Sequence, residues 1–115
     1  MNLKENLIAM DSLVQQGQIP QAVEQFFDAC AKSKDHNGAI TNSKAEMLDK
    51  MDQFLGGIAN VNGITLHNQA VGENVTMSEY TFDFDMKDGS KVLWNEIIKR
   101  EWEGDKVVNE SYFLL

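Results

Sequence analysis

The stretch KVLWNEIIKREWEGDKVVNESYF, residues 91–113, reads as two β-strands joined by a tight turn at Gly104-Asp105. In a half-buried strand, apolar side chains occupy one face and polar side chains the other. Here both faces of the first strand carry charge, and one of them combines Trp94, Glu96, Ile98, Arg100 and Trp102. Because charged groups inside a protein require partners, the direction of this face decides what the protein can do.

The two turns that flank this strand predict its pairing. A two-residue turn at Gly104-Asp105 sets Glu103 opposite Lys106, and a three-residue loop with a left-handed Gly89 closes the preceding hairpin. A two-residue loop there would set Phe82 opposite Asn95, whereas the three-residue loop gathers the aromatic residues on one face and is preferred. The predicted pairs are Phe84–Val92, Phe82–Trp94, Tyr80–Glu96, Trp102–Val107, Arg100–Asn109, Ile98–Ser111 and Glu96–Phe113, with Lys99–Glu110 (a surface ion pair) and Ile97–Tyr112 on the other face.

This register predicts a concave face with aromatic walls and a few polar groups, a composition typical of a small-molecule pocket. Its expected members are Tyr80, Phe82, Phe84, Trp94, Glu96, Ile98, Arg100, Trp102, Val107, Asn109 and Phe113. Burial among aromatic rings raises the pKa of a carboxyl group, so Glu96 is a candidate general acid or base. A purely structural interpretation stays open, in which Glu96 binds Tyr80 and Arg100 reaches solvent at the rim.

The first half of the chain has helical periodicity. Apolar residues at Leu3, Leu7, Met10, Leu13 and Val14 predict a helix that ends near Gly17. Pro20 opens a second helix, and Ser43 with Glu46 has the spacing of a capping box for a third. The expected apolar stripes are Val23, Phe26, Phe27 and Cys30 in the second helix, and Met47, Leu48, Met51, Phe54, Leu55 and Ile58 in the third, which Gly56-Gly57 ends.

From residue 61 onward the period changes to two, which predicts four long antiparallel strands. Apolar parity along residues 74–86 changes once, at Ser78-Glu79, and predicts a β-bulge there. Helices followed by strands define an α+β class, with three helices packed in the hollow of one strongly bent sheet. A length of 115 residues fits a single domain, 1–115.

Composition excludes several function classes. The net charge of −8, without a basic cluster, argues against nucleic acid as a partner. The amphipathic N-terminus predicts neither a signal peptide nor a membrane span, and the lone Cys30, expected as a small buried hydrophobe, suits a reducing, cytoplasmic setting. No phosphate-binding loop and no metal-ligand spacing occurs, so neither a cofactor nor a metal is expected.

Two segments, WNEIIKREWEGDKVVNESYF and FFDACAKSKDHNGAITNSKAEMLDKM, resemble the closing hairpin and the helix–strand–helix region of SnoaL-like proteins. The resemblance covers nearly the whole chain. It implies the nuclear transport factor 2-like fold, a cone-shaped sheet with an internal pocket, often dimeric through its outer sheet face. In ketosteroid isomerase and polyketide cyclase relatives an Asp or His in the cone acts as acid or base. His36 is the nearest match here, although it also suits a solvated turn, and Asp83 and Asp85 are expected to face outward.

Two functions remain from the sequence. The first is an enzyme that uses Glu96, with Tyr80 or His36, for proton transfer on a small apolar carbonyl compound held against Phe82, Trp94, Arg100, Trp102, Asn109 and Phe113. The second is a binding or dimeric scaffold domain without turnover, since this fold hosts both. Ile97, Tyr112 and Leu114 on the outer sheet face form the expected homodimer patch.

Overall fold

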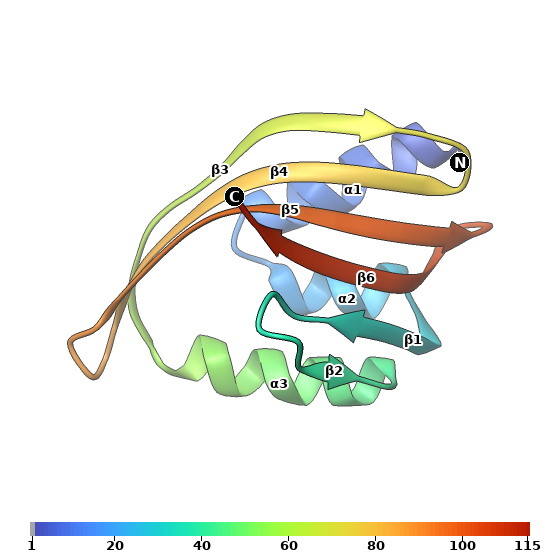
Figure 1. The fold of residues 1–115 in the computed structure, drawn as a ribbon. Coiled ribbons are helices and arrows are strands. Elements are labelled where there is room, and N and C mark those ends of the chain that lie inside the picture. The colour runs from blue at the N-terminus through green and yellow to red at the C-terminus, as the bar shows by residue number, and fades with distance from the viewer. Residues whose placement is uncertain (1) are drawn as a thin grey trace.

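The computed structural model of this protein describes residues 2–115. Three helices and six strands follow one another along the chain: α1 (Leu3–Gln15), α2 (Ile19–Phe26), β1 (Phe27–Lys34), β2 (Ile40–Thr41), α3 (Lys44–Gly56), β3 (Ile58–Val71), β4 (Val75–Met86), β5 (Lys91–Glu103) and β6 (Lys106–Leu114). The strands form one curved sheet in the order β2-β1-β6-β5-β4-β3, in which β1 and β6 are parallel and the other neighbours are antiparallel (Figure 1).

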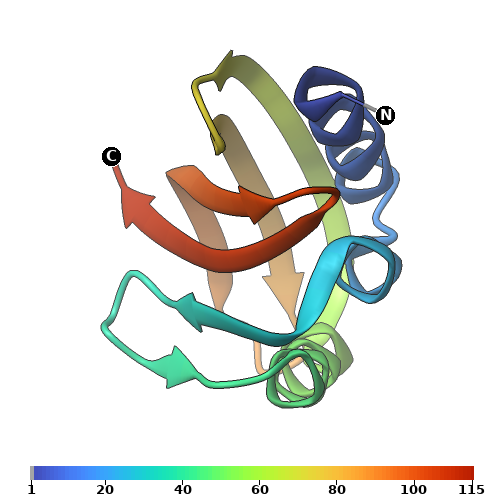
Figure 2. The same ribbon diagram turned by 90° about the vertical axis from the view of Figure 1, so that its right-hand side faces the viewer.

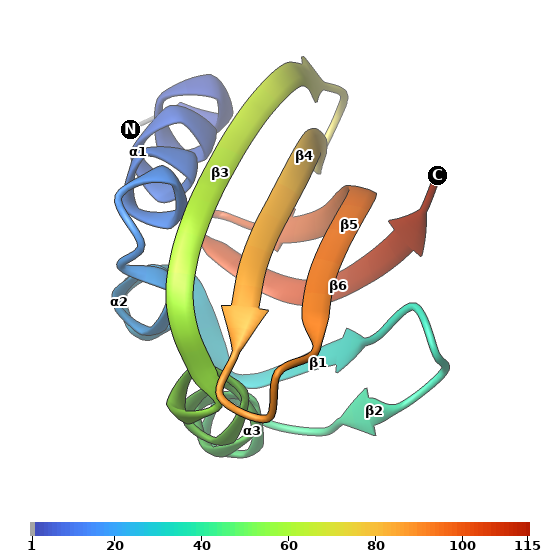
Figure 3. The same ribbon diagram turned by 90° about the vertical axis from the view of Figure 1, so that its left-hand side faces the viewer.

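The sheet is strongly curved, and the helices lie along one side of it (Figure 2). The long strand β3 runs beside α1, while α3 lies at the end where β3 begins (Figure 3). The predicted α+β class, with three helices against the concave side of a strongly bent sheet, is confirmed. The buried core lies between helices and sheet and is made of Met10, Val14, Ala22, Val23, Phe26, Phe27, Ala31, Met47, Tyr80, Phe82, Phe84, Ile98, Trp102 and Val107.

Local sequence signals set the helix ends. The Ser43 hydroxyl accepts a hydrogen bond from the backbone N–H of Glu46 at 3.1 Å, which confirms the predicted cap of α3. Gly17 follows α1 with φ +79°, a left-handed conformation that glycine adopts at low cost. Ile58, expected in the stripe of α3, instead begins β3 because the helix ends at the glycine pair.

The second helix is shorter than its apolar stripe predicted. It ends at Phe26, and the chain passes directly into β1, where Phe27 pairs with Val107 of β6. Pairing with a distant strand thus overrides the local helical period. Cys30 lies on an irregular part of β1 and is exposed, so the prediction of a buried cysteine is wrong.

The register between β4 and β5 is as predicted, with Phe84 opposite Val92, Phe82 opposite Trp94 and Tyr80 opposite Glu96. Gly89 has φ +88° in the connecting loop. This pairing is continuous from residue 75 to residue 85, so the bulge predicted at Ser78-Glu79 is wrong. The apolar parity changes there because the buried Thr76 and Ser78 form hydrogen bonds inside the protein. The irregular positions next to β4 lie in its other neighbour, β3.

The register between β5 and β6 holds for the first two pairs and then shifts. Glu103 faces Lys106 and Trp102 faces Val107, but an irregularity follows and Arg100 faces Glu110. All later predicted pairs are therefore wrong by one residue, including the Lys99–Glu110 surface ion pair and Ile97–Tyr112. As a consequence Glu110 is buried, while Asn109 and Phe113, predicted to line the hollow, are exposed.

Candidate functional site

A cavity of about 130 Å³ lies between the three helices and the concave side of the sheet. Six residues of the face predicted from the sequence line it, namely Phe82, Phe84, Trp94, Glu96, Ile98 and Arg100. Helices supply most of its remaining apolar wall. The full lining is Met10, Val14, Ile19, Ala22, Val23, Asp35, Met47, Lys50, Met51, Phe54, Leu55, Phe82, Phe84, Trp94, Glu96, Ile98, Arg100, Glu110 and Tyr112. A cavity of this size admits a compound about as large as a small aromatic ring.

Aromatic rings form a continuous part of the wall. Trp94 of β5 stacks on Phe54 of α3 with ring centroids 5.4 Å apart and an interplanar angle of 20°. Phe54 in turn meets Phe84 edge-on at 6.0 Å, and Phe82 lies 6.0 Å beyond Phe84. Such contacts hold each ring in place, so the wall is pre-formed for an apolar guest.

Glu96 places a carboxyl group in this apolar surrounding. Its side chain comes from the middle of β5 and is 3% exposed. Burial, followed by the charges of Asp35 and Glu110, raises the pKa of Glu96 to about 7. A carboxyl group with this pKa exchanges protons readily near neutral pH, as a general acid or base must.

His36 approaches Glu96 from the turn that follows β1. Its Nδ1 lies 4.0 Å from Glu96 Oε2 and 3.4 Å from Asp35 Oδ1, and its ring meets Trp94 edge-on with centroids 5.0 Å apart. The same Asp35 forms an ion pair with Lys50 of α3, whose Nζ lies 2.9 Å from Asp35 Oδ2. His36 is therefore not confined to a solvated turn, because these contacts bring it to the candidate acid or base.

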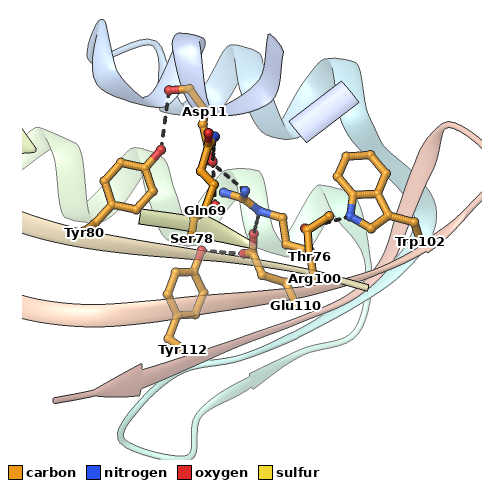
Figure 4. Close-up of polar contacts among 9 residues, drawn as sticks. All are labelled: Asp11, Gln69, Thr76, Ser78, Tyr80, Arg100, Trp102, Glu110 and Tyr112. Carbon is orange, nitrogen blue, oxygen red and sulfur yellow. Dashed lines mark hydrogen bonds and ion pairs between the residues drawn. The ribbon is translucent and has the colours of Figure 1, made fainter. Parts of the chain in front are cut away.

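Arg100 is held by two carboxylates (Figure 4). Its Nη1 lies 2.8 Å from Asp11 Oδ1, its Nε lies 3.1 Å from Glu110 Oε2, and its side chain is 2% exposed. Burial by itself would raise the pKa of Asp11, but the Arg100 guanidinium and hydrogen bonds from Ser78 and Gln69 hold this pKa below its usual value. The alternative in which Arg100 reaches solvent at the rim is wrong.

Asp11 and Glu110 are polar residues that sequence reasoning missed. Asp11 follows Leu7 by four positions and precedes Val14 by three, so an acidic residue on the buried stripe of α1 was its detectable signal. The signal for Glu110 was hidden by the irregular pairing of β6. Its second oxygen accepts a hydrogen bond from the Tyr112 hydroxyl, which completes the satisfied buried cluster in Figure 4.

Tyr80 and Trp102 face the interior without lining the cavity. The Tyr80 hydroxyl donates to the backbone carbonyl of Asp11 at 3.4 Å rather than to Glu96, and its ring stacks on Phe82. The indole N–H of Trp102 donates to the Thr76 hydroxyl at 3.0 Å. The Tyr80 bond thus joins the sheet to α1, whereas the Trp102 bond joins β5 to β4 (Figure 4).

Within residues 2–115, no three His, Cys, Asp or Glu side chains lie close enough together to hold a metal ion. In the same part of the chain, no helix combines the length and the apolar character needed to cross a membrane.

Fold and cavity together define an α+β cone with a small apolar pocket that contains a buried carboxyl group. No protein-family model and no curated protein sequence matches the chain. Solved structures do match. A protein of Mesorhizobium loti assigned as a SnoaL-like polyketide cyclase has a TM-score of 0.89 at 18% identity, with 98% of this chain and 99% of that chain covered.

Two further structures contain ligands. A ketosteroid isomerase-like protein of Catenulispora acidiphila, in complex with trimethylamine, has a TM-score of 0.77 at 14% identity over 92% of this chain and 82% of that one. TerC, co-crystallized with polyporic acid, has a TM-score of 0.77 at 6% identity, with 96% of this chain and 89% of that chain covered. The chain therefore has the nuclear transport factor 2-like fold, which SnoaL-like and ketosteroid isomerase-like proteins share.

Proposed function

We propose that this protein is a SnoaL-like small-molecule-binding protein in which Glu96 moves a proton on a bound carbonyl compound. The observation that carries the proposal is the position of Glu96, a 3% exposed carboxyl group that lines an aromatic cavity. No hydrogen bond from the described residues offsets the desolvation that raises its pKa to about 7. Groups with such perturbed pKa values in a cleft are candidates for catalysis.

The proposed step is cofactor-independent. The Glu96 carboxylate takes a proton from the carbon next to a carbonyl group, and the electron pair of the broken C–H bond moves into the enolate. Glu96 then returns the proton to the same or a conjugated carbon. His36 Nδ1 lies 4.0 Å from this carboxyl group and 3.4 Å from Asp35, which pairs with Lys50. The aromatic wall excludes water and holds the apolar part of the substrate.

Two structures of similar fold support a small-molecule ligand for this protein, since one is a complex with trimethylamine and the other was co-crystallized with polyporic acid. A binding protein without turnover is the second candidate. The observation that favours this second candidate is the pairing of the buried Arg100 with Asp11 and Glu110. Because both carboxylates already engage its guanidinium group, Arg100 is not free to stabilise an enolate.

Deuterium exchange into cyclohexanone tests the choice between them. The ketone is incubated with the protein in D₂O, and loss of its α-proton signals is followed by NMR. We expect exchange faster than in buffer, reduced to the buffer rate by Glu96→Gln and unchanged by Glu101→Gln, an exposed control on the same strand. Exchange that survives Glu96→Gln would refute the assignment, and ketone binding without exchange would establish the non-catalytic alternative.

We also propose that the outer sheet face forms a homodimer. Tyr112 lines the cavity and Leu114 lies opposite the inward-facing Glu96, so neither belongs to the outer patch expected from the sequence. Phe113 takes the place of Tyr112, lying opposite Ile97 with 52% of its surface exposed, and Met77 on β4 is 43% exposed. We expect Phe113→Asp to convert a dimer to a monomer in size-exclusion chromatography with light scattering. A wild-type monomer at micromolar concentration would contradict this proposal.

A further inference from the structure

We propose that the cavity selects a small organic cation, such as an alkylammonium compound, over neutral and anionic molecules of the same shape. This inference rests on the proposed ligand-binding role of the cavity and specifies the chemical class of its ligand. It follows from two independent features of the wall, the balance of its charges and the arrangement of its aromatic rings.

The charges that line the cavity leave one carboxyl group without a matched cation. Two cationic side chains, Lys50 and Arg100, stand against three carboxyl groups, Asp35, Glu96 and Glu110. Lys50 already pairs with Asp35 at 2.9 Å, and Arg100 pairs with Glu110 at 3.1 Å and with a fourth carboxylate from α1 at 2.8 Å. An anionic ligand would find its cationic partners occupied. A bound cation would instead give Glu96 a permanently charged partner, which His36 at 4.0 Å is only when protonated.

The aromatic wall adds a second attraction for positive charge. Trp94, Phe54 and Phe84 contact one another, and all three line the cavity. Cations are attracted to the electron-rich faces of aromatic rings, most strongly to tryptophan, and this attraction grows when water is excluded. A trimethylammonium group would thus meet a carboxyl group and aromatic rings in one small apolar space.

Binding of a cation beside Glu96 should be coupled to the release of a proton, an effect that apolar packing alone does not produce. A cation beside Glu96 favours the ionised carboxylate, so binding near or below neutral pH expels a proton from a group whose pKa is about 7 in the empty cavity. The titratable and charged groups around Glu96 come from several elements and are Tyr80 of β4, Asp35 and His36 after β1, Lys50 of α3, Arg100 of β5, and Glu110 and Tyr112 of β6.

Isothermal titration calorimetry with three probes of one shape tests the proposal. The probes are choline, its neutral tert-butyl analogue in which carbon replaces nitrogen, and the anion tert-butylacetate. We expect choline to bind the wild-type protein about tenfold or more tightly than the neutral analogue at about pH 8, a ratio that cation–π and ionic contacts of moderate strength produce. The anion should bind more weakly than either.

Variants identify the groups responsible. Glu96→Gln keeps the shape of the side chain and should bring choline close to its neutral analogue, whereas the exposed control Glu101→Gln should keep the preference. Trp94→Leu should lower it without changing any charge. Between about pH 6 and pH 8 the choline affinity should rise, with proton release seen in buffers of different ionisation enthalpy. His36→Gln should retain this rise, which separates Glu96 from the titration of the histidine.

Equal or tighter binding of the neutral analogue would overturn the ligand class, as would an absence of choline binding. The same holds for a choline preference that Glu96→Gln leaves intact. Exchange into cyclohexanone judges the proposed function separately, because that ketone carries no charge. A protein that exchanges ketone protons but shows no preference for choline would therefore keep the proposed function and lose only this inference.

Discussion

Replacing Glu96 with glutamine is expected to stabilise the protein at neutral and alkaline pH. Burial, together with the charges of Asp35 and Glu110, raises the pKa of Glu96 from 4.5 to about 7 in the folded protein. A carboxyl group with a raised pKa binds its proton more tightly in the folded state. Its ionisation therefore costs no stability below about pH 4.5, and the cost grows until the pH passes about 7.

The magnitude follows from the pKa difference between the unfolded and folded states. Each pKa unit corresponds to about 1.4 kcal/mol, so Glu96 lowers the free energy of unfolding by roughly 3 kcal/mol at about pH 8. Glutamine has the same shape and no charge. The cost of burying its amide does not depend on pH. The pH dependence of the difference in unfolding free energy between the variant and the wild type therefore reports on the carboxyl group alone.

Urea denaturation at several pH values measures this difference. We expect the variant to gain stability relative to the wild type as the pH rises from about 4.5 to 7, with a constant difference above that range. Glu101→Gln, on the exposed side of β5, removes the same charge from a protein of net charge −8 and corrects for general repulsion. A difference that stays flat across this range would refute the raised pKa and the reasoning built on it.

Substitutions at three further residues test other parts of the structure. Arg100→Met leaves Asp11 and Glu110 buried without their cation, and we expect a loss of about 3–5 kcal/mol in urea denaturation, so a loss below about 1 kcal/mol would contradict the buried ion pairs. Ser43→Ala removes the cap of α3 and should cost about 1 kcal/mol, whereas Ser43→Asp should retain most of the stability. Trp102→Phe keeps an aromatic ring but loses a buried hydrogen bond, so thermal unfolding should show a cost of about 1–2 kcal/mol, and an unchanged melting temperature would argue against that bond.

The hairpin between β4 and β5 could be predicted from the sequence because its turn and its pairing are local. Gly89 fixes the loop, and the alternation of aromatic residues along β4 then aligns Phe82 with Trp94. The inward direction of Glu96 followed from this register, and with it the expectation of a carboxyl group in an apolar hollow. Helix ends at Gly17 and Ser43 were equally local, since caps depend on a few neighbouring residues.

The polar cluster around Arg100 could not be predicted in the same way. Its partners lie 89 and 10 positions away in sequence, and one of them turns inward because the pairing of β5 with β6 slips by one residue. No turn residue marks that slip. The hydrogen bonds of Thr76 and Ser78 likewise made polar residues face the interior, which resembled a bulge in the sequence pattern.

The sequence by itself determined the three helices, the four C-terminal strands, the α+β class and the direction of the Trp94–Glu96 face, because periodicity, caps and turn residues act over short distances. The strands β1 and β2, which lie between α2 and α3, did not follow from its periodicity. Tertiary structure decided that Phe27 belongs to a strand, that Glu110 rather than Asn109 enters the interior, and that His36 reaches Glu96. These outcomes depend on contacts between segments far apart in the chain, where burial and ion pairing outweigh the local pattern.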